Sequence, residues 1–275
     1  MKQKIAIQGI KGSNHHQVVR EYFGDDTDLV ESRSFDDLVD RLLDKTAAMG
    51  VMAIENSIAG SIIPNYALVY HNDLHIIGEH YLNINHNLMV LKGQNIGDIE
   101  EVRSHPMALL QCKEFFRDYP HIKMVEDVDT AETAKCIQEE TWFHIAAIAP
   151  EVAASLYDLD IVAPQIQTIK NNETRFIIVS TKNKLIPKDE INKASVRFVT
   201  DHKRGSLATV LNVMSDCNMN MTKIQSLPII ETPWKYAFFV DVTFDTYKDF
   251  DKAKSLLGIM AEDFKVLGEY KNVRI

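Results

Sequence analysis

Two neighbouring side chains, the hydroxyl of Thr174 and the guanidinium of Arg175, stand at the start of an apolar run that predicts a buried strand over Phe176–Val179. Polar groups at a strand end can meet a ligand from a rigid base. A threonine hydroxyl can donate one hydrogen bond, and an arginine can hold a carboxylate through two. Adjacent strand residues point to opposite faces, so both can line one pocket only where the strand is irregular. The alternatives are ordinary β propensity for Thr174 and a surface ion pair for Arg175.

A second polar segment, Glu55–Ser57, follows an apolar run at Val51–Ile54 that predicts another strand. It brings a carboxylate, an amide and a hydroxyl together, close to Gly60. Each of these side chains could cap a helix. Three of them in a row favour a binding or catalytic site at the end of the strand.

Two further segments could contact a small anion. His105, between Ser104 and Pro106, could act as an acid or a donor near neutral pH, or it could simply cap the helix that follows. The loop containing Gly9 and Gly12 could bring its backbone, and the N-terminus of the next helix, close to a negative charge. This loop lacks the third glycine of a dinucleotide fingerprint, and a tight turn is its alternative interpretation.

The elements that must position these groups alternate between short strands and helices. Strands are predicted at Lys4–Ile7, Val51–Ile54 and His144–Ile148, with a long extended stretch over His75–Leu91. Helices are predicted near Gln17–Phe23, after Pro106 with Leu109, Cys112 and Phe116 on one face, after the capping pair Asp129 and Glu132, and after Pro150. Such alternation predicts an α/β fold with mostly parallel strands.

The pattern changes after Thr181–Asn192, a polar segment with one proline that reads as a linker. Beyond it the order strand, helix, strand, strand, helix, strand is typical of the ferredoxin-like fold. The strands are expected at Ala194–Val199, Met219–Ile230, Trp234–Phe244 and Lys265–Val273. The two helices are marked by Leu207, Val210, Leu211 and Met214, and by Phe250, Ala253, Leu257 and Met260.

The composition excludes several classes of protein. A net charge of -9 over 275 residues argues against nucleic acid as the main partner, because phosphate binding needs a basic face. The three cysteines are far apart and the ten histidines are scattered, so neither a disulfide framework nor a metal site is predicted. The sequence has no signal-peptide pattern and no apolar run long enough for a membrane span. We therefore expect a cytoplasmic protein.

Taken together and in this order, the four polar segments resemble the prephenate dehydratase family. The family's glycine-rich opening matches Gly9 and Gly12, and its Glu-Asn-Ser segment matches residues 55–57. Its Ser-His-Pro segment matches residues 104–106, and its Thr-Arg-Phe signature matches residues 174–176. The C-terminal part resembles the ACT regulatory domain, with the run GSLATVL at the start of its first helix.

The resemblance implies a two-lobed α/β catalytic domain, similar to type II periplasmic binding proteins, followed by a ferredoxin-like ACT domain. The catalytic domain would span residues 1–181, with lobe one at about 1–79 and 166–181 and lobe two at about 80–165. Residues 182–192 would form the linker, and residues 193–275 the ACT domain. No chorismate mutase segment precedes residue 1, so a monofunctional enzyme is expected.

The activity implied is the decarboxylating dehydration of prephenate to phenylpyruvate in L-phenylalanine biosynthesis, without a cofactor. The residues carried over to catalysis are Thr174, Glu55 and His105. Those carried over to substrate binding are Gly12, Ser13, Asn56, Ser57, Ser104, Asn172, Arg175 and Phe176. The opening loop departs from the family at Ser13-Asn14-His15, where an aromatic residue and a serine usually follow the hydroxyl.

The resemblance also implies feedback by phenylalanine at an ACT–ACT interface, in a homodimer or homotetramer. The effector contacts carried over are Gly205, Ser206, Leu207 and Asn220. The segment Gln225–Pro228 departs from the family, which usually has glutamate first and arginine third, so both usual charges are missing. Two alternative functions remain open: arogenate dehydratase, which performs the same chemistry on the aminated substrate, and a non-catalytic amino-acid sensor.

Overall fold

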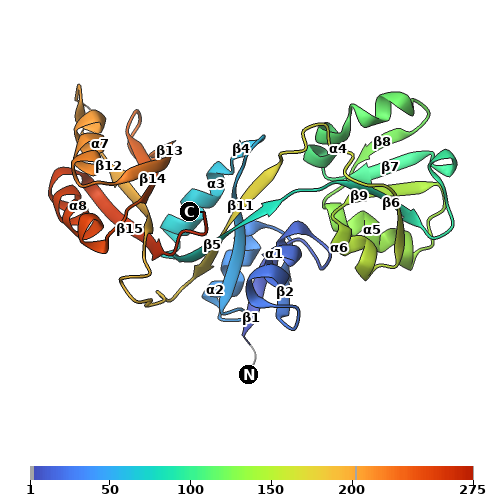
Figure 1. Cartoon of the computed structure of the whole chain (residues 1–275), viewed down its shortest axis with the longest axis horizontal. Helices are drawn as coiled ribbons and strands as arrows, with labels where there is room; N and C mark the ends of the chain where they lie inside the picture. The colour runs from blue at the N-terminus through green and yellow to red at the C-terminus, as the bar shows by residue number, and fades with distance from the viewer. Residues whose placement is uncertain (1–2, 202, 275) are drawn as a thin grey trace. The chain divides into compact units, whose positions relative to one another are not determined.

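The computed structural model describes residues 3–201 and 203–274 (Figure 1). By their contacts, the residues of the chain form two compact units, each made of two separate stretches. The first unit consists of Met1–Gly60 and Tyr81–Phe176, and the second of Ser61–His80 and Ile177–Ile275. The chain therefore passes from one unit to the other three times.

The first sheet is built around parallel strands near the N-terminus. Its strand order is β2-β1-β3-β11-β5, and β1 is parallel to both β2 and β3. Two of its strands, β11 and β5, begin in one unit and end in the other. The elements of this region are β1 (Lys4–Gln8), α1 (Asn14–Phe23), β2 (Asp28–Ser32), α2 (Phe35–Leu43), β3 (Met49–Asn56), β4 (Gly60–Ser61), α3 (Ile63–His71), β5 (His75–Asn83) and β11 (Glu173–Ser180).

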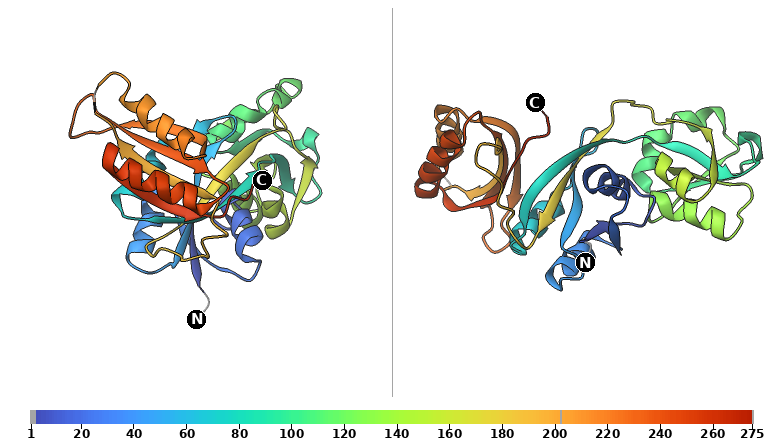
Figure 2. Two further views of the ribbon diagram at one scale, coloured as in Figure 1. Left: turned by 60° about the vertical axis from the view of Figure 1, so that its left-hand side comes forward. Right: turned by 60° about the horizontal axis from the view of Figure 1, so that its bottom comes forward.

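The second sheet lies wholly in the first unit and has the order β10-β6-β9-β7-β8. Leu88 and Val90 face a core shared with α4, whereas Met89, between them, faces a core shared with α5 and α6. Helices thus cover both faces (Figure 2). The elements are β6 (Asn87–Leu91), η1 (Ile96–Asp98), β7 (Glu101–Ser104), α4 (Pro106–Cys112), η2 (Phe115–Asp118), β8 (Lys123–Glu126), α5 (Thr130–Glu139), β9 (Ile145–Ala149), α6 (Glu151–Leu156) and β10 (Leu159–Ala163).

The prediction of mostly parallel strands is wrong for this second sheet. Strand β7 is parallel to β8 and β9, but β6 is antiparallel to both β9 and β10. The chain enters the sheet along β6 and leaves it along β10 beside it, which requires opposite directions. The extended stretch predicted over His75–Leu91 is two strands, β5 and β6, separated by residues 84–86.

The C-terminal sheet confirms the predicted ferredoxin-like fold. Its strand order is β13-β14-β12-β15, and every neighbouring pair is antiparallel. Val196, Phe198 and Val242 pack with Val210 of α7 and Phe250 of α8 into one core. The elements are β12 (Lys193–Val199), α7 (Ser206–Asp216), β13 (Asn220–Pro228), β14 (Tyr236–Thr243), α8 (Tyr247–Met260) and β15 (Glu262–Tyr270). Residues 181–192, predicted as a linker, contain neither helix nor strand.

Among the described residues, no helix combines the length and the apolar character needed to cross a membrane. The domain boundaries proposed from the sequence stay a prediction.

Candidate active site

The amide of Asn56, at the end of β3, holds the first residues of β11. Its Nδ2 donates to Thr174 Oγ1 at 2.9 Å and to Asn172 Oδ1 at 2.7 Å. Its Oδ1 accepts from the backbone N–H groups of Ile58 and Ala59, which fixes the orientation of the amide. The structure therefore brings together two segments, Glu55–Ser57 and Asn172–Thr174, that are more than one hundred positions apart in the sequence.

Two further polar side chains extend this group: Gln111, on α4, and His86, just before β6. Asn172 Nδ2 donates to Gln111 Oε1 at 2.8 Å, and that oxygen also lies 2.8 Å from His86 Nε2. Burial lowers the pKa of His86, so the ring is neutral and its Nε2–H is the donor to Gln111. We call Asn56, Gln111, Asn172 and Thr174 the amide–hydroxyl cluster. Each amide in it is oriented by a neighbour, so the position of the Thr174 hydroxyl is fixed.

Ser57 joins the same two strand ends through the backbone. Its N–H donates to Glu173 O at 2.8 Å, and its Oγ accepts from Glu173 N at 2.9 Å. Ser57, just after β3, therefore bonds both backbone polar groups of Glu173, the first residue of β11. This arrangement explains why a polar segment can stay ordered at a strand end.

The side chains of Arg175 and Glu55 point away from the strand faces that carry Thr174 and Asn56. β11 is regular from Glu173, so the side chain of Arg175 points away from the face that carries Thr174. Glu55 precedes Asn56 on β3, so its side chain likewise points away from the face that carries Asn56. Both Thr174 and Arg175 are buried. The structure thus groups Thr174 with Asn56. The assignments of Arg175 to substrate binding and of Glu55 to catalysis stay predictions.

The glycine-rich loop after β1 packs against the start of α5. Gly9 has φ +86°, and a methyl group placed on it would lie 2.3 Å from Asp129 Oδ2. Asp129 caps α5 by accepting from Ala131 N at 2.6 Å, as its pattern predicted. Burial, reinforced by the charge of Glu132 nearby, raises the pKa of this carboxyl. Only a glycine leaves room for a carboxyl group so close to the loop.

Gly12 and Ser13 hold the other end of that loop. Gly12 has φ +94° and lies against the ring of Tyr157, whose hydroxyl donates to Lys11 O at 2.6 Å. Ser13 is buried and caps α1 by accepting from His16 N at 3.3 Å. The loop is therefore held at both glycines, by Asp129 at the start of α5 and by Tyr157 at the end of α6.

His15, which departs from the family's usual residue, is part of the core. Its ring lies edge-on to Phe176, with centroids 5.0 Å apart, and to Phe35 at 5.6 Å. Burial lowers its pKa to about 3, so the imidazole is uncharged at neutral pH. The contact links α1 to Phe176, which lies two residues beyond Thr174 on the same face of β11.

Ser104 is the last residue of β7, and His105 follows it, close to Asp129. Ser104 is fully buried and donates its hydroxyl to Ile148 O at 2.6 Å. His105 is exposed and caps α4 through Nδ1, which accepts from Met107 N at 3.2 Å. Its charge when protonated lowers the pKa of Asp129, in opposition to burial. His105 therefore caps a helix, as one alternative had it, and its assignment to catalysis stays a prediction.

The model of the prephenate dehydratase family matches residues 5–184. The chain belongs to the prephenate dehydratase family. Among curated relatives, the bifunctional chorismate mutase/prephenate dehydratase of Escherichia coli (strain K12) is 30% identical over 276 residues, covering 99% of this chain and 72% of the relative. The chloroplastic arogenate dehydratase/prephenate dehydratase 2 of Arabidopsis thaliana is 32% identical over 279 residues, covering 97% of this chain and 72% of the relative.

Two solved structures have the fold of this prephenate dehydratase family member over nearly its whole length. A prephenate dehydratase from Arthrobacter aurescens in complex with L-Phe has a TM-score of 0.87 at 21% identity, covering 98% of this chain and 90% of that chain. GqqA, described as a quorum quenching acylase, has a TM-score of 0.87 at 24% identity, covering 99% of both chains. At these identities the likeness establishes the fold and leaves the chemistry to be argued from the site.

Two residues with a place in this prephenate dehydratase site were not singled out from the sequence as functional. Gln111 follows Ser104 by seven positions, on the helix that the Ser-His-Pro segment opens. Asp129 was recognised only as a helix cap. Gln111 could have been found from the sequence, because it is a polar residue on the helix that begins at the Ser-His-Pro segment. The contact of Asp129 with Gly9 could not, because it depends on tertiary packing alone.

Asp129 gives a prediction about pH. A raised pKa means that its protonated form stabilises the fold below the unfolded-state pKa of about 3.9, and that this contribution is lost as pH rises through the folded-state pKa. Asn caps helices as well as Asp, and it carries no charge. We therefore expect the melting temperature of Asp129→Asn, relative to wild type, to increase between about pH 4 and pH 7. A difference that is constant with pH, followed by calorimetry, would contradict the raised pKa.

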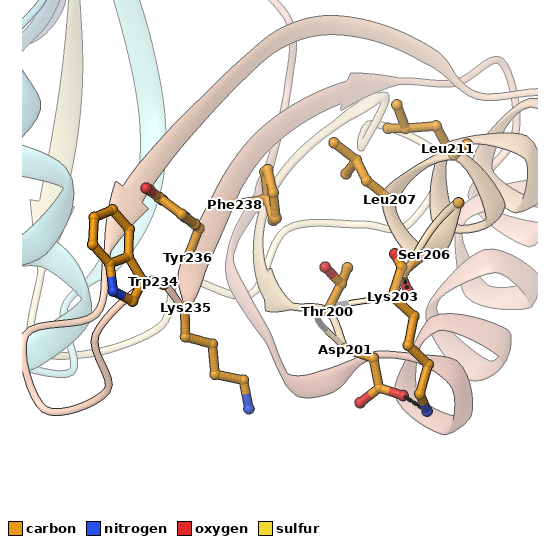
Figure 3. Close-up of a pocket in the computed structure, with 12 residues that line it drawn as sticks. Thr200, Asp201, Lys203, Ser206, Leu207, Leu211, Trp234, Lys235, Tyr236 and Phe238 are labelled. Atoms are coloured by element: carbon orange, nitrogen blue, oxygen red, sulfur yellow. Dashed lines mark hydrogen bonds and ion pairs between the residues drawn. The ribbon is translucent and has the colours of Figure 1, made fainter.

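A second candidate site is a pocket of about 450 Å³ at the start of α7, within the second unit (Figure 3). Figure 3 shows Leu207 and Leu211 of α7 facing the same space as Phe238 of β14. At its rim Asp201 and Lys203 form an ion pair of 2.6 Å. The predicted effector residues Gly205, Ser206 and Leu207 line this pocket, whereas Asn220, at the start of β13, is not among its lining residues.

Proposed function

We propose that this protein converts prephenate to phenylpyruvate, with loss of carbon dioxide and water. The observation that carries the proposal is the direction of the bond between Asn56 and Thr174. Because Thr174 Oγ1 accepts from the Asn56 amide, the threonine's own proton remains available for donation to a ligand. A fixed donor of this kind suits a reaction in which a hydroxyl group must leave.

In the proposed step, the bond between the ring carbon and its carboxylate breaks and carbon dioxide departs. The bonding electrons complete the aromatic ring and break the bond to the ring hydroxyl, which takes up one proton and leaves as water. Thr174 stabilises the departing oxygen by a hydrogen bond that strengthens as negative charge develops there. The proton is supplied by water or by an acid in the site, and aromatisation drives the reaction without a cofactor.

The substrate carries two carboxylates, so a site wall without negative charge avoids repelling it. The amide–hydroxyl cluster is uncharged, and His86 beside it is neutral because it is buried. We propose the N–H groups of the glycine-rich loop, with Ser13 and Ser57, as further contacts of the substrate.

We further propose that phenylalanine regulates the enzyme through the pocket at the start of α7. The pocket combines an apolar lining with charges of both signs at Asp201 and Lys203, which suits the two charged ends of an amino acid. The relative from Arthrobacter aurescens was solved with L-Phe. Strand β13 is an edge of its sheet and is exposed along much of its length, so we propose that a second copy pairs there in a homodimer or homotetramer.

The test is an absorbance assay of phenylpyruvate formation from prephenate, with and without phenylalanine. We expect turnover without added metal or cofactor, and a lower rate when phenylalanine is present. The same assay on arogenate decides the main alternative, because kcat/KM should be higher for prephenate. A purified, folded protein that turns over neither substrate would leave the non-catalytic sensor as the better reading. We propose that the enzyme acts in the cytoplasm.

A further inference from the structure

The C-terminal sheet has a second face that is buried although it is polar. Along β12, Ala194, Val196 and Phe198 point to the core shared with α7 and α8. The alternate residues Lys193, Ser195 and Arg197 therefore point to the other face, and all three are buried. A sheet face lined by charged side chains is buried only if other residues of the protein cover it and pair with those charges.

Residues 61–80 of the second unit provide that cover. The ring of Tyr66 lies 5.4 Å from that of Phe239, and the guanidinium of Arg197 lies 3.8 Å from the centre of the Tyr70 ring. Tyr70 donates its hydroxyl to Asp263 at 2.8 Å. Figures 1 and 2 show α7 and α8 on one side of the sheet and α3 on the other. The N-terminal segment that contains α3 and most of β5 thus packs as part of the C-terminal unit.

One ion pair in this layer lies on β5 itself. Lys193 Nζ donates to both carboxylate oxygens of Glu79, at 2.9 and 2.8 Å. The side chains of Lys193 and Glu79 are 3% and 0% exposed. A buried pair of this kind contributes little net stability, but loss of one partner is strongly destabilising, because the other charge is left buried and unpaired.

Both strands that carry the pair continue to a candidate site. β12 begins at Lys193 and is followed by Thr200 and Asp201, which line the pocket at the start of α7. Beyond Glu79, β5 continues to its end at Asn83. The next residue, Ile84, donates its N–H to Asn172 O at 2.6 Å. About 16 Å of extended chain separates Glu79 from Ile84. Asn172 belongs to the amide–hydroxyl cluster that holds Thr174.

We infer that Glu79 is a positioning residue: paired with Lys193, it sets β5 so that Ile84 holds Asn172, and it thereby couples the C-terminal pocket to the hydroxyl of Thr174. The regulatory half of this inference rests on the proposed function. The positioning half does not, because it concerns the strand and the hydrogen bond of Ile84 in the ligand-free protein.

The experiment compares wild type with Glu79→Leu/Lys193→Met, which removes both buried charges together, and with the reversed pair Glu79→Lys/Lys193→Glu. Lys265→Met is the matched control, because Lys265 Nζ also bonds residues 61–80, at Asp73, but does not contact β5 through that bond. The readouts are amide hydrogen exchange at Ile84, kcat and KM on prephenate, and the effects of phenylalanine on melting temperature and on kcat.

We expect the charge-free double variant to exchange the Ile84 amide at least tenfold faster and to lose kcat severalfold with KM little changed. It should still bind phenylalanine, but the inhibition factor should fall below twofold. The reversed pair should recover at least half of each effect, and Lys265→Met should match wild type. Wild-type exchange at Ile84 together with a wild-type kcat in a folded double variant would overturn the inference.

The wild-type protein separates this result from the fate of the proposed function. If wild type neither binds phenylalanine nor is inhibited by it, the proposed regulation fails, and with it the coupling to the pocket. If wild type has no activity on prephenate, the proposed chemistry fails. In both cases the exchange of Ile84 still decides whether Glu79 positions β5. If the double variant is inhibited as strongly as wild type, the coupling through Glu79 is refuted even though regulation stands.

Discussion

Replacing Thr174 by valine is expected to lower kcat on prephenate by roughly 10²–10³-fold, the range for loss of one donor in an oxyanion site. The two side chains have the same shape, and Thr174 is buried on a strand, so the variant should fold. The missing hydroxyl would remove a bond that strengthens only in the transition state. For that reason kcat and kcat/KM should fall together, with KM nearly unchanged.

The matched control is Thr174→Ser, which keeps the hydroxyl and the acceptor for Asn56. Its kcat should stay within about tenfold of wild type, well above that of the valine variant. Circular dichroism and thermal melts establish that both variants are folded. A folded valine variant with wild-type kcat would remove the Thr174 hydroxyl from the mechanism, and the amide–hydroxyl cluster would then need another donor.

Replacing Gly268 by alanine should destabilise the second unit by about 3 kcal/mol, the upper part of the usual range for overpacking. The added methyl group on β15 would lie 2.1 Å from the carbonyl oxygen of Ile76 and 2.7 Å from its Cβ. The obstacle is backbone of β5, which cannot rotate away as a flexible side chain can. The strand β15 would have to move away from β5, loosening the layer that contains Glu79.

Gly258→Ala is the control for this prediction, because it makes the same chemical change in the same unit. Gly258 lies in α8, and a methyl group there would meet no heavy atom within 4 Å. Since glycine costs about 0.5–1 kcal/mol relative to alanine in a helix, this control should raise the stability. Melting temperatures of the two variants should therefore shift in opposite directions. A Gly268→Ala protein as stable as wild type would contradict the close packing of β15 on β5.

The sequence predicted best those elements whose apolar residues form a single stripe. The C-terminal strands and helices were all expected, and Phe250, Ala253 and Leu257 of α8 are buried. Met260 was expected in the same stripe but is 45% exposed, because it lies in the last turn of the helix. Periodicity therefore predicted the fold of this half well, up to the helix end.

Elements with weaker patterns were not predicted. Helix α3 buries Asn65, Tyr66 and Val69 while Ile63 at its start is exposed, so its apolar residues form no clean stripe. The short strands β2, β8 and β10 and the helix α2 were also not identified. Strands β2, β8 and β10 lie at sheet edges, where partial exposure removes the alternating pattern that marks a strand.

The candidate site was predictable as four segments but not as a set of contacts. Asn56 and Thr174 were both named from the sequence, yet the pairing of β3 with β11 that joins them is set by tertiary structure. Gln111 and Asp129 acquire their place only through residues far away in the chain. Glu79 and Lys193 belong to residue types that are almost never fully buried unless paired, so their burial could not be expected from either residue alone.

The division of the second unit into two stretches also bears on how the protein is made. Glu79 leaves the ribosome 114 residues before Lys193 does. Because the chain is synthesised at about 5–20 residues per second, on the order of ten seconds pass before Lys193 is available to pair with the carboxylate of Glu79. Residues 81–176 are complete before that moment, whereas the C-terminal sheet against which residues 61–80 pack has not yet been made. The layer that Glu79 and Lys193 join therefore forms only after nearly three quarters of the chain has been made.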